Sequence, residues 1–192
     1  MITVIDDFLP REDFEKLQEL VMSREFPWYY VDCASAPFGA FVPDNATETI
    51  GWVHIAFSKN NNTRSQALPV FANLLDIIVE KFNVEIIRVR ASMKSYKKGF
   101  TESNYNLPHV DYFFPHVSIV YYINETDGDT WVFDQMYTEQ PEPKEFTVKQ
   151  RVSPKPNRLL LIDGLQYHTA SNPINNDCRV IININGVKKE LL

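Results

Sequence analysis

The stretch His116-Val117-Ser118-Ile119-Val120-Tyr121-Tyr122-Ile123-Asn124 is followed by Asp127-Gly128-Asp129 and then by a second apolar run over residues 130–134. Aromatic and β-branched residues at this density favour strands, and Gly between two Asp residues favours a turn. Further strands are predicted on both sides of this stretch, separated by Pro, Gly and Asn residues, over residues 84–96, 145–152, 158–163 and 178–187. Many short strands with such breaks indicate an all-β sandwich or barrel. Eight short strands in two sheets would form a jelly roll, which can hold a site between its sheets.

Two helices are predicted before this β-rich part. One begins near Pro10, because Pro is tolerated in a first turn, and its apolar residues recur at helical spacing as far as Val21. The other covers residues 68–82, and a short strand over residues 50–57 lies between them. The predicted fold class is mainly β (α+β), with at least two supporting helices packed on one sheet. We expect a single domain over residues 1–192, in which 1–83 supply helical support and variable loops and 84–192 form the core.

Composition and charge narrow the class of protein. Hydrophobic residues make up 44% of the chain and charged residues 23%, as in ordinary globular proteins. The net charge of −6 disfavours nucleic acid as a partner, because phosphate-backbone binders are normally basic. The start of the chain has no basic region followed by an apolar one, and no apolar run approaches membrane-spanning length. We therefore expect no membrane partner and a cytoplasmic location, in a bacterium or in the host of a phage. The two cysteines, Cys33 and Cys178, are too few for a disulfide framework.

The motif His109-Val110-Asp111 is the first candidate for metal binding. In an extended segment, residues two apart point the same way, so the imidazole and the carboxylate can reach one ion. The alternative is a loop histidine capped by a neighbouring aspartate.

A second candidate follows an apolar strand. Residues 159–163 lead into Gly164, and His168 comes four residues later. Two histidines and one carboxylate on one face of an ion leave three positions open, the pattern of iron(II) oxygenases. A bidentate 2-oxo acid can take two of these positions and dioxygen the third. A structural zinc site would instead be closed by four protein ligands.

Arg179 comes eleven residues after His168, beyond a turn-rich segment. A hairpin centred near Pro173 and Ile174 would make His168 and Arg179 neighbours across a strand pair. A guanidinium there could bind a carboxylate bidentately while the other end of the same molecule chelates iron. Alternatively, Arg179 lies on an outward strand face, paired to Asp177.

Together, His109, Asp111, His168 and Arg179 resemble the H-x-D…H…R signature of the 2-oxoglutarate- and iron(II)-dependent oxygenases. The prolyl 4-hydroxylase-like branch, with its compact bacterial and phage-type members, is the most similar. The opening at residues 5–10, the segment 119–130 and the segment 154–164 add to the resemblance, which is good from residue 84 onward and loose before it. Many members have Gly-Gly where this chain has Gly128-Asp129, and some have Lys in place of Arg179.

The resemblance implies a double-stranded β-helix, a variant of the jelly roll. It also implies decarboxylation of 2-oxoglutarate coupled to hydroxylation of a second substrate, such as a prolyl or other peptidyl side chain or a small molecule. His109, Asp111 and His168 would hold iron(II), Arg179 would bind the far carboxylate of 2-oxoglutarate, and ascorbate would serve as reductant. Because Asp111 is retained, hydroxylation is favoured over halogenation.

The resemblance also places Tyr96 and Tyr122 at positions where co-substrate contacts occur, although both could equally be packed core aromatics. Other residues are interpreted structurally: His54 as a packing or surface residue, His116 as the start of a strand, and Cys178 as buried. Trp28, Tyr29 and Tyr30 form either core packing or a lid. Substrate contacts are expected from residues 25–66 and 96–108.

Two other functions fit the same residues. A cupin-like jelly-roll module could use them for a structural or sensing metal without oxygenase activity. A zinc hydrolase could bind its metal through two histidines and an aspartate, but it would lack an obvious general base and would leave Arg179 unexplained.

Overall fold

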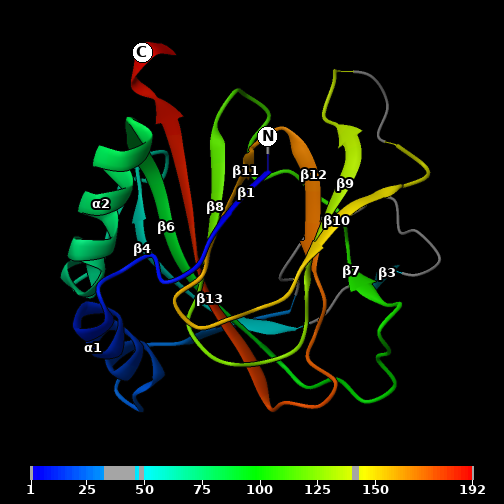
Figure 1. Cartoon of the computed structure of the whole chain (residues 1–192), viewed down its shortest axis with the longest axis horizontal. Coiled ribbons are helices and arrows are strands. Elements are labelled where there is room, and N and C mark those ends of the chain that lie inside the picture. The colour runs from blue at the N-terminus through cyan, green and yellow to red at the C-terminus, as the bar shows by residue number, and fades with distance from the viewer. Residues whose placement is uncertain (1, 33–45, 48–49, 140–142, 192) are drawn as a thin grey trace.

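A large antiparallel sheet and a smaller one face each other in the computed structural model, which describes residues 2–32, 46–47, 50–139 and 143–191 (Figure 1). The large sheet has the order β1-β11-β8-β13-β6-β4-β2, with β5 paired to β4. Its strands are β1 (Ile2–Ile5), β2 (Tyr29–Val31), β4 (Gly51–Ser58), β5 (Thr63–Arg64), β6 (Val84–Ser95), β8 (Val117–Tyr122), β11 (Leu159–Asp163) and β13 (Cys178–Lys188).

The smaller sheet has the order β10-β9-β12, and a short parallel pair, β3 and β7, lies apart from it. These strands are β3 (Ala46–Thr47), β7 (Tyr105–Asn106), β9 (Thr130–Met136), β10 (Val148–Val152) and β12 (Gln166–Ala170). From β8 onward the chain alternates between the sheets: β8, β11 and β13 belong to the large sheet, and β9, β10 and β12 to the small one. This alternation is that of a double-stranded β-helix, so the predicted fold class is confirmed.

Two helices cover the outer face of the large sheet (Figure 1). The elements are α1 (Arg11–Met22), the short 3₁₀ helix η1 (Leu68–Phe71) and α2 (Ala72–Phe82), and a second 3₁₀ turn, η2 (Lys189–Leu191), follows β13. Of the apolar residues predicted to lie on one face of each helix, Leu20 is exposed, whereas Leu17 and Val21 of α1 and Leu74 and Ile78 of α2 are buried. They pack in one cluster with the sheet, as amphipathic helices do.

Strand β8 is buried on both faces and therefore separates two cores. Ile119, Tyr121 and Ile123 pack under the helices, whereas Val120 and Tyr122 pack between the two sheets. Successive side chains of a strand point to opposite faces, so this parity follows from the sequence of β8. The interior between the sheets is the space in which a site can form.

Most predicted elements lie where the sequence placed them, but six strands were missed, of which four have only two or three residues: β1, β2, β3, β5, β7 and β12. Strand β1 pairs with β11 over Ile2–Ile5 and Leu159–Ile162. Strand β12, which carries His168, pairs with β9. None of the helices in the described part of the chain has the length and apolar character needed to cross a membrane.

Asn157 joins the N-terminal segment to the large sheet. Its side-chain oxygen accepts the backbone N–H of Leu9 at 2.8 Å and the hydroxyl of Tyr121 at 2.6 Å, and its amide donates to the carbonyl of Leu9 at 2.8 Å. The residue has φ +60°, the left-handed conformation that Asn tolerates better than most residues. The side chain is buried, so these hydrogen bonds have no replacement in water.

We predict that Asn157→Ala lowers the free energy of unfolding by about 2 to 4 kcal/mol, because it leaves buried donors and acceptors unpaired and puts Ala at positive φ. Urea denaturation measures this change. Asn62→Ala is the matched control, since Asn62 is exposed and has φ +49°. This substitution should lower the free energy of unfolding by only about 1 kcal/mol, the cost of placing Ala at positive φ. Equal losses in the two variants would contradict a structural role for the Asn157 hydrogen bonds.

Candidate metal centre

The three predicted metal ligands meet between the two sheets, although His168 lies far along the chain from the other two. One ligand atom of each of His109, Asp111 and His168 lies within 4.8 Å of the others. His109 and Asp111 lie on the segment between β7 and β8, and His168 lies on β12. The backbone joins them directly, because the N–H of each histidine donates to the carbonyl of the other at 3.0 Å.

Each of the two imidazoles is oriented by a backbone carbonyl two residues before it. Nδ1 of His109 donates to the carbonyl of Leu107 at 3.0 Å, and Nδ1 of His168 donates to that of Gln166 at 2.9 Å. A carbonyl can only accept, so each neutral ring carries its proton on Nδ1 and presents the lone pair of Nε2. This arrangement of a second hydrogen bond behind the ligand atom is typical of histidines that bind metals.

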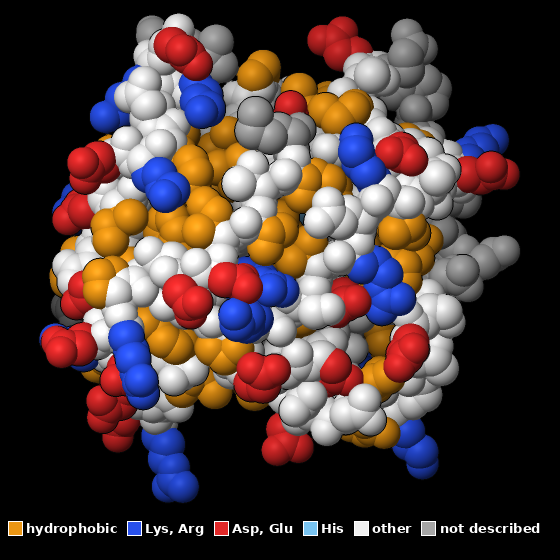
Figure 2. Space-filling model, in the orientation of Figure 1, with side chains coloured by type: hydrophobic (Ala, Val, Ile, Leu, Met, Phe, Trp, Pro, Cys, Tyr) orange, Lys and Arg blue, Asp and Glu red, His pale blue; other side chains and the backbone are white. Residues whose placement is uncertain are grey.

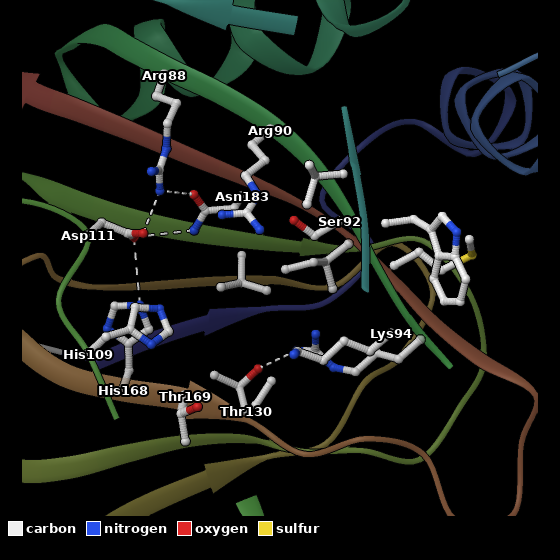
Figure 3. A pocket seen from close by; sticks show the side chains of 17 residues that line it. Arg88, Arg90, Ser92, Lys94, His109, Asp111, Thr130, His168, Thr169 and Asn183 are labelled. Atoms are coloured by element: carbon white, nitrogen blue, oxygen red, sulfur yellow. Dashed lines mark hydrogen bonds and ion pairs between the residues drawn. The ribbon is translucent and has the colours of Figure 1, made fainter. Parts of the chain in front are cut away.

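Asp111 is held by side chains from three strands of the large sheet. Its carboxylate pairs with Arg88 of β6, and it accepts hydrogen bonds from Ser118 of β8 at 2.8 Å and Asn185 of β13 at 2.9 Å. Asn183 of β13 contributes a longer contact of 3.4 Å. The carboxylate is thus fixed in position, with Nε2 of His168 3.7 Å from its Oδ2 (Figure 3).

The protonation states match those that a divalent metal requires. Burial, followed by the nearby charge of His168, lowers the pKa of His109 to about 4. Burial by itself raises the pKa of Asp111, but the paired guanidinium of Arg88, together with the neighbouring His168, outweighs it and holds that pKa well below its usual value. At neutral pH, His109 is therefore neutral and Asp111 ionised, the forms that coordinate a metal.

The residues present fit an iron(II) ion. Two imidazole nitrogens and a carboxylate oxygen form the 2-His-1-carboxylate set, and a cavity opens beside them. Among the described residues, the cluster contains these three ligands and no fourth. A closed structural zinc site has four protein ligands, so this centre leaves room for exogenous ligands.

The cavity continues from the three ligands to Arg179. It encloses about 650 Å³, its open mouth included. The described lining residues are Trp52, Val53, Arg88, Arg90, Ser92, Met93, Lys94, His109, Asp111, Val120, Thr130, His168, Thr169, Ala170, Arg179, Ile181 and Asn183. Arg179 is only 3% exposed, so the alternative of an outward Arg179 paired to Asp177 is wrong.

The predicted hairpin between His168 and Arg179 is also wrong. Strand β12 pairs with β9, and β13, which carries Arg179, pairs with β6 and β8. The two residues belong to opposite sheets and reach one cavity from opposite sides. The reason is that the chain crosses from the small sheet to the large one between β12 and β13, so these two consecutive strands do not pair.

Arg179 is positioned by Thr130 and Tyr122. Its Nη2 donates to the hydroxyl of Thr130 at 2.8 Å, and its guanidinium carbon lies 5.6 Å from the centre of the Tyr122 ring. The hydroxyl of Tyr122 also donates to Thr130, at 2.7 Å. Tyr122 is fully buried beneath this pair and does not line the cavity. It therefore orients Arg179 instead of facing a ligand.

Tyr96 does not line the cavity. It follows the end of β6, is 52% exposed, and its backbone N–H donates to the carbonyl of Asp177. Thr130 is the residue that supplies a hydroxyl next to Arg179, and nothing in the sequence marked it beyond its place at the start of a strand.

The polar residues of β6 that line the cavity were not predicted from the sequence. Arg88, Arg90, Ser92 and Lys94 alternate with apolar residues along β6 and line the cavity. Such alternation normally marks a strand with one face in water, so it predicted the strand but not the inward direction of its polar side chains.

Gly128 and Asp129 lie near Arg179. Gly128 has φ +93°, and a Cβ there would lie 2.9 Å from the carbonyl oxygen of Ser171 and 3.2 Å from Cδ of Arg179, so glycine is required. Asp129 instead pairs with Arg151 at 2.9 Å. The position where many relatives have a second glycine therefore carries a side chain that pairs away from Arg179.

The remaining candidates have structural positions. His54 is buried and its ring nitrogens contact the carbonyl of Pro27 and the hydroxyl of Ser65, which confirms the packing interpretation. His116 directly precedes β8, close to the predicted strand start, and its Nε2 lies 3.3 Å from the Ser118 hydroxyl. Trp28 packs against the core, whereas Tyr29 and Tyr30 are exposed. Cys178 is half-buried, and Cys33 lies outside the described residues.

Comparisons with known proteins agree with this fold. No protein-family model matches the chain, and no curated protein matches it. Among solved structures, a 2OG-Fe(II) oxygenase family oxidoreductase from Burkholderia pseudomallei is 11% identical, with a TM-score of 0.65 over 98% of this chain and 88% of that one. A prolyl hydroxylase from Trichoplax adhaerens, in complex with a hypoxia inducible factor oxygen degradation domain peptide fragment, is 14% identical, with a TM-score of 0.57 over 98% and 84%.

A third similar structure is the epimerase SnoN from nogalamycin biosynthesis, in complex with Fe³⁺, alpha ketoglutarate and nogalamycin RO. It is 12% identical, with a TM-score of 0.60 over 97% of this chain and 78% of that one. The chain thus shares the fold of the 2-oxoglutarate- and iron(II)-dependent oxygenases, which include prolyl hydroxylases, and the resemblance noted in the sequence is confirmed at the level of the fold.

We predict that His109→Ala, Asp111→Ala and His168→Ala each weaken binding of Mn²⁺, a stand-in for iron(II), by more than about 100-fold, since even loss of an outer hydrogen bond to a ligand costs about 10- to 100-fold. Electron paramagnetic resonance of free Mn²⁺ measures this. His54→Gln, at a buried histidine away from the cavity, should retain wild-type affinity. A ligand variant that binds Mn²⁺ like the wild type would remove that residue from the centre.

The metal-free protein should lose stability in mild acid because of His109. The folded state holds the pKa of His109 near 4, whereas an unfolded histidine has a pKa of about 6.5. The contribution of neutral His109 to the free energy of unfolding is therefore complete above about pH 6.5. It is lost as the pH falls towards 4, which lowers the free energy of unfolding by about 3 kcal/mol. In urea titrations at several pH values, His109→Asn should show a smaller decline over this window. Equal declines in both proteins would contradict the assignment.

Proposed function

We propose that this protein is a 2-oxoglutarate- and iron(II)-dependent hydroxylase. The observation that carries the proposal is that a 2-His-1-carboxylate cluster and a buried arginine share one cavity. 2-Oxoglutarate has a 2-oxo acid at one end, which chelates a metal, and a carboxylate at the other. A site with a metal centre at one end and a guanidinium at the other matches both ends of this molecule.

Arg179 and Thr130 are prepared to bind the far carboxylate. Nε of Arg179 is buried without a hydrogen-bond partner among the described residues. The Thr130 hydroxyl accepts from both Arg179 and Tyr122, so its own hydrogen is left to donate to a ligand. Burial lowers the pKa of Arg179, but arginine keeps its charge in proteins. A carboxylate placed here would satisfy both donors.

The protein's residues would position iron rather than carry out the oxidation themselves. Bound iron(II), together with 2-oxoglutarate, would supply dioxygen activation, decarboxylation of the 2-oxo acid to succinate and carbon dioxide, and hydroxylation of a second substrate. The carbonyls of Leu107 and Gln166 orient the histidines, and Arg88, Ser118 and Asn185 fix Asp111. Val120 and Ile181 line the cavity with apolar groups that limit the entry of water.

The competing functions have less support. Of the described residues that line the cavity, Asp111 is the sole carboxylate, and His109 and His168 are the two imidazoles. A zinc hydrolase would need a further general base of this kind, and none is present there. A cupin-like metal-binding module without oxygenase activity would not explain why the guanidinium of Arg179 is buried in the same cavity.

The second substrate is a peptidyl side chain or a small molecule in this proposal. The prolyl hydroxylase of similar fold is bound to a peptide fragment and the epimerase to nogalamycin RO, so the fold accepts both kinds. The proposal also includes ascorbate as reductant and a cytoplasmic location.

We predict that protein supplied with iron(II), 2-oxoglutarate and dioxygen releases succinate, slowly alone and faster with its second substrate. Asp111→Ala should abolish release. Arg179→Gln should raise the KM for 2-oxoglutarate by about 10- to 100-fold, since a charge-assisted hydrogen bond contributes about 1.5 to 3 kcal/mol, and Arg179→Lys should raise it less.

Arg24→Gln is the control, because Arg24 is exposed, lies just after the end of α1 and does not line the cavity. Its KM and rate should equal those of the wild type. Full succinate release by Asp111→Ala would rule out the proposed function.

A further inference from the structure

The two oxygen atoms of the Asp111 carboxylate have different partners. Oδ1 pairs with the guanidinium of Arg88, whereas Oδ2 accepts hydrogen bonds from the Ser118 hydroxyl at 2.8 Å and the Asn185 amide at 2.9 Å. Oδ2 is also the oxygen that lies 3.7 Å from Nε2 of His168. Oδ1 therefore contacts a cation, whereas Oδ2 contacts neutral donors and faces another metal ligand.

Arg88 is held in place by residues other than Asp111. The same Nη2 atom that pairs with Asp111 also donates to the side-chain oxygen of Asn183 at 2.9 Å. The guanidinium carbon lies 5.2 Å from the centre of the Tyr112 ring. Figure 3 shows Arg88 and the two histidines on opposite sides of the Asp111 carboxylate. The guanidinium is thus anchored on the side of the carboxylate that faces away from the other metal ligands.

This arrangement favours Oδ2 over Oδ1 as the atom that binds a divalent ion. Oδ2 and Nε2 of His168 are 3.7 Å apart, so one ion can lie about 2.1 Å from each of them. An ion against Oδ1 would instead lie next to the positive charge of Arg88 and be repelled by it. The neutral donors Ser118 and Asn185 cause no such repulsion at Oδ2.

The number of carboxylate oxygens that bind the ion decides how many positions remain open. A carboxylate can bind an ion through one oxygen or through both. Around a six-coordinate ion, two histidines and one carboxylate oxygen leave three positions open, whereas a carboxylate bound through both oxygens leaves two. The proposed function needs three, of which the 2-oxo acid takes two and dioxygen one. A contact that occupies Oδ1 would therefore preserve the position for dioxygen.

We propose that Arg88 is a positioning residue that keeps Oδ1 of Asp111 away from the ion, so that the carboxylate binds through Oδ2 alone and the third position stays open. Arg88 acts through Asp111 and needs no contact with the ion or with a substrate. The inference rests on the proposed function for the use of the third position. The number of open positions, however, can be measured without any co-substrate.

The test counts the water molecules bound to Mn²⁺, because water fills the positions that the protein leaves open. Electron–nuclear double resonance of the Mn²⁺-loaded full chain in ¹⁷O-enriched water gives this number. A second count after addition of 2-oxoglutarate tests the proposed function separately, since chelation by the 2-oxo acid displaces two waters. Each variant is prepared with Mn²⁺, which supplies a positive charge next to Asp111, and its folding is checked by circular dichroism.

We expect three waters in the wild type and one after 2-oxoglutarate is added. Arg88→Met, a side chain of similar length without a donor or a charge, should show two waters, and none with 2-oxoglutarate. Its affinity for Mn²⁺ should equal or exceed that of the wild type, because a nearby positive charge is removed. Ser118→Ala is the matched control: it removes a hydrogen bond from the other oxygen of the same carboxylate and should keep three waters.

The contrary outcomes are distinct. Three waters in Arg88→Met, or two in the wild type, would overturn the inference, whatever the titration with 2-oxoglutarate shows. If Ser118→Ala also loses a water, general loosening of Asp111 explains the change and the assignment to Arg88 is wrong. If 2-oxoglutarate displaces no water from the wild type, the proposed function fails, and the counts without it still decide whether Arg88 controls how Asp111 binds.

A second variant covers the case in which Arg88→Met does not fold even with Mn²⁺. Asn183→Ala keeps the positive charge beside Asp111 but removes the oxygen that anchors Nη2 of Arg88. The guanidinium is then free to leave Oδ1, so the mean number of bound waters should fall below three. A count of three in this variant would overturn the inference.

Discussion

The burial of the Asp111 carboxylate is the constraint on which the rest of the site depends. Its side chain is 7% exposed, and removing an ionised carboxylate from water costs several kcal/mol unless other groups compensate. The compensation comes from Arg88, Ser118 and Asn185, which lie on three adjacent strands of the large sheet. The sheet must therefore form in its correct register before the carboxylate can be buried, so folding and site assembly are coupled.

Strand β13 sets the length of the site. Its alternate residues Asn185, Asn183, Ile181 and Arg179 face the interior between the sheets, the first two beside Asp111 and the last at the far end of the cavity. Because side chains on one face of a strand recur every second residue, one continuous strand fixes the separation between the metal centre and the guanidinium. The small sheet then supplies His168 and Thr130 from the opposite side, on β12 and β9.

The sequence predicted the fold well because its strands are rich in aromatic and β-branched residues and its helices have one apolar face. It also predicted that His109, Asp111 and His168 would lie together as candidate metal ligands, and the structure brings the three residues together. It failed where position depends on the pairing of distant strands. The supposed hairpin between His168 and Arg179 followed from closeness along the chain, whereas the fold places the two strands in opposite sheets. Arg88 and Arg90 were missed because an alternating polar strand does not reveal which face lies inward.

In the proposed function, one molecule of 2-oxoglutarate binds to both the metal and Arg179. Calorimetric titration of Mn²⁺-loaded and metal-free protein with 2-oxoglutarate and with glutarate, which lacks the keto oxygen, tests it directly. We expect tight binding only when the protein holds the metal and the acid has a keto group. Arg179→Gln should bind 2-oxoglutarate more weakly than the wild type. Equal binding of 2-oxoglutarate with and without metal, or equal binding of the two acids, would contradict it.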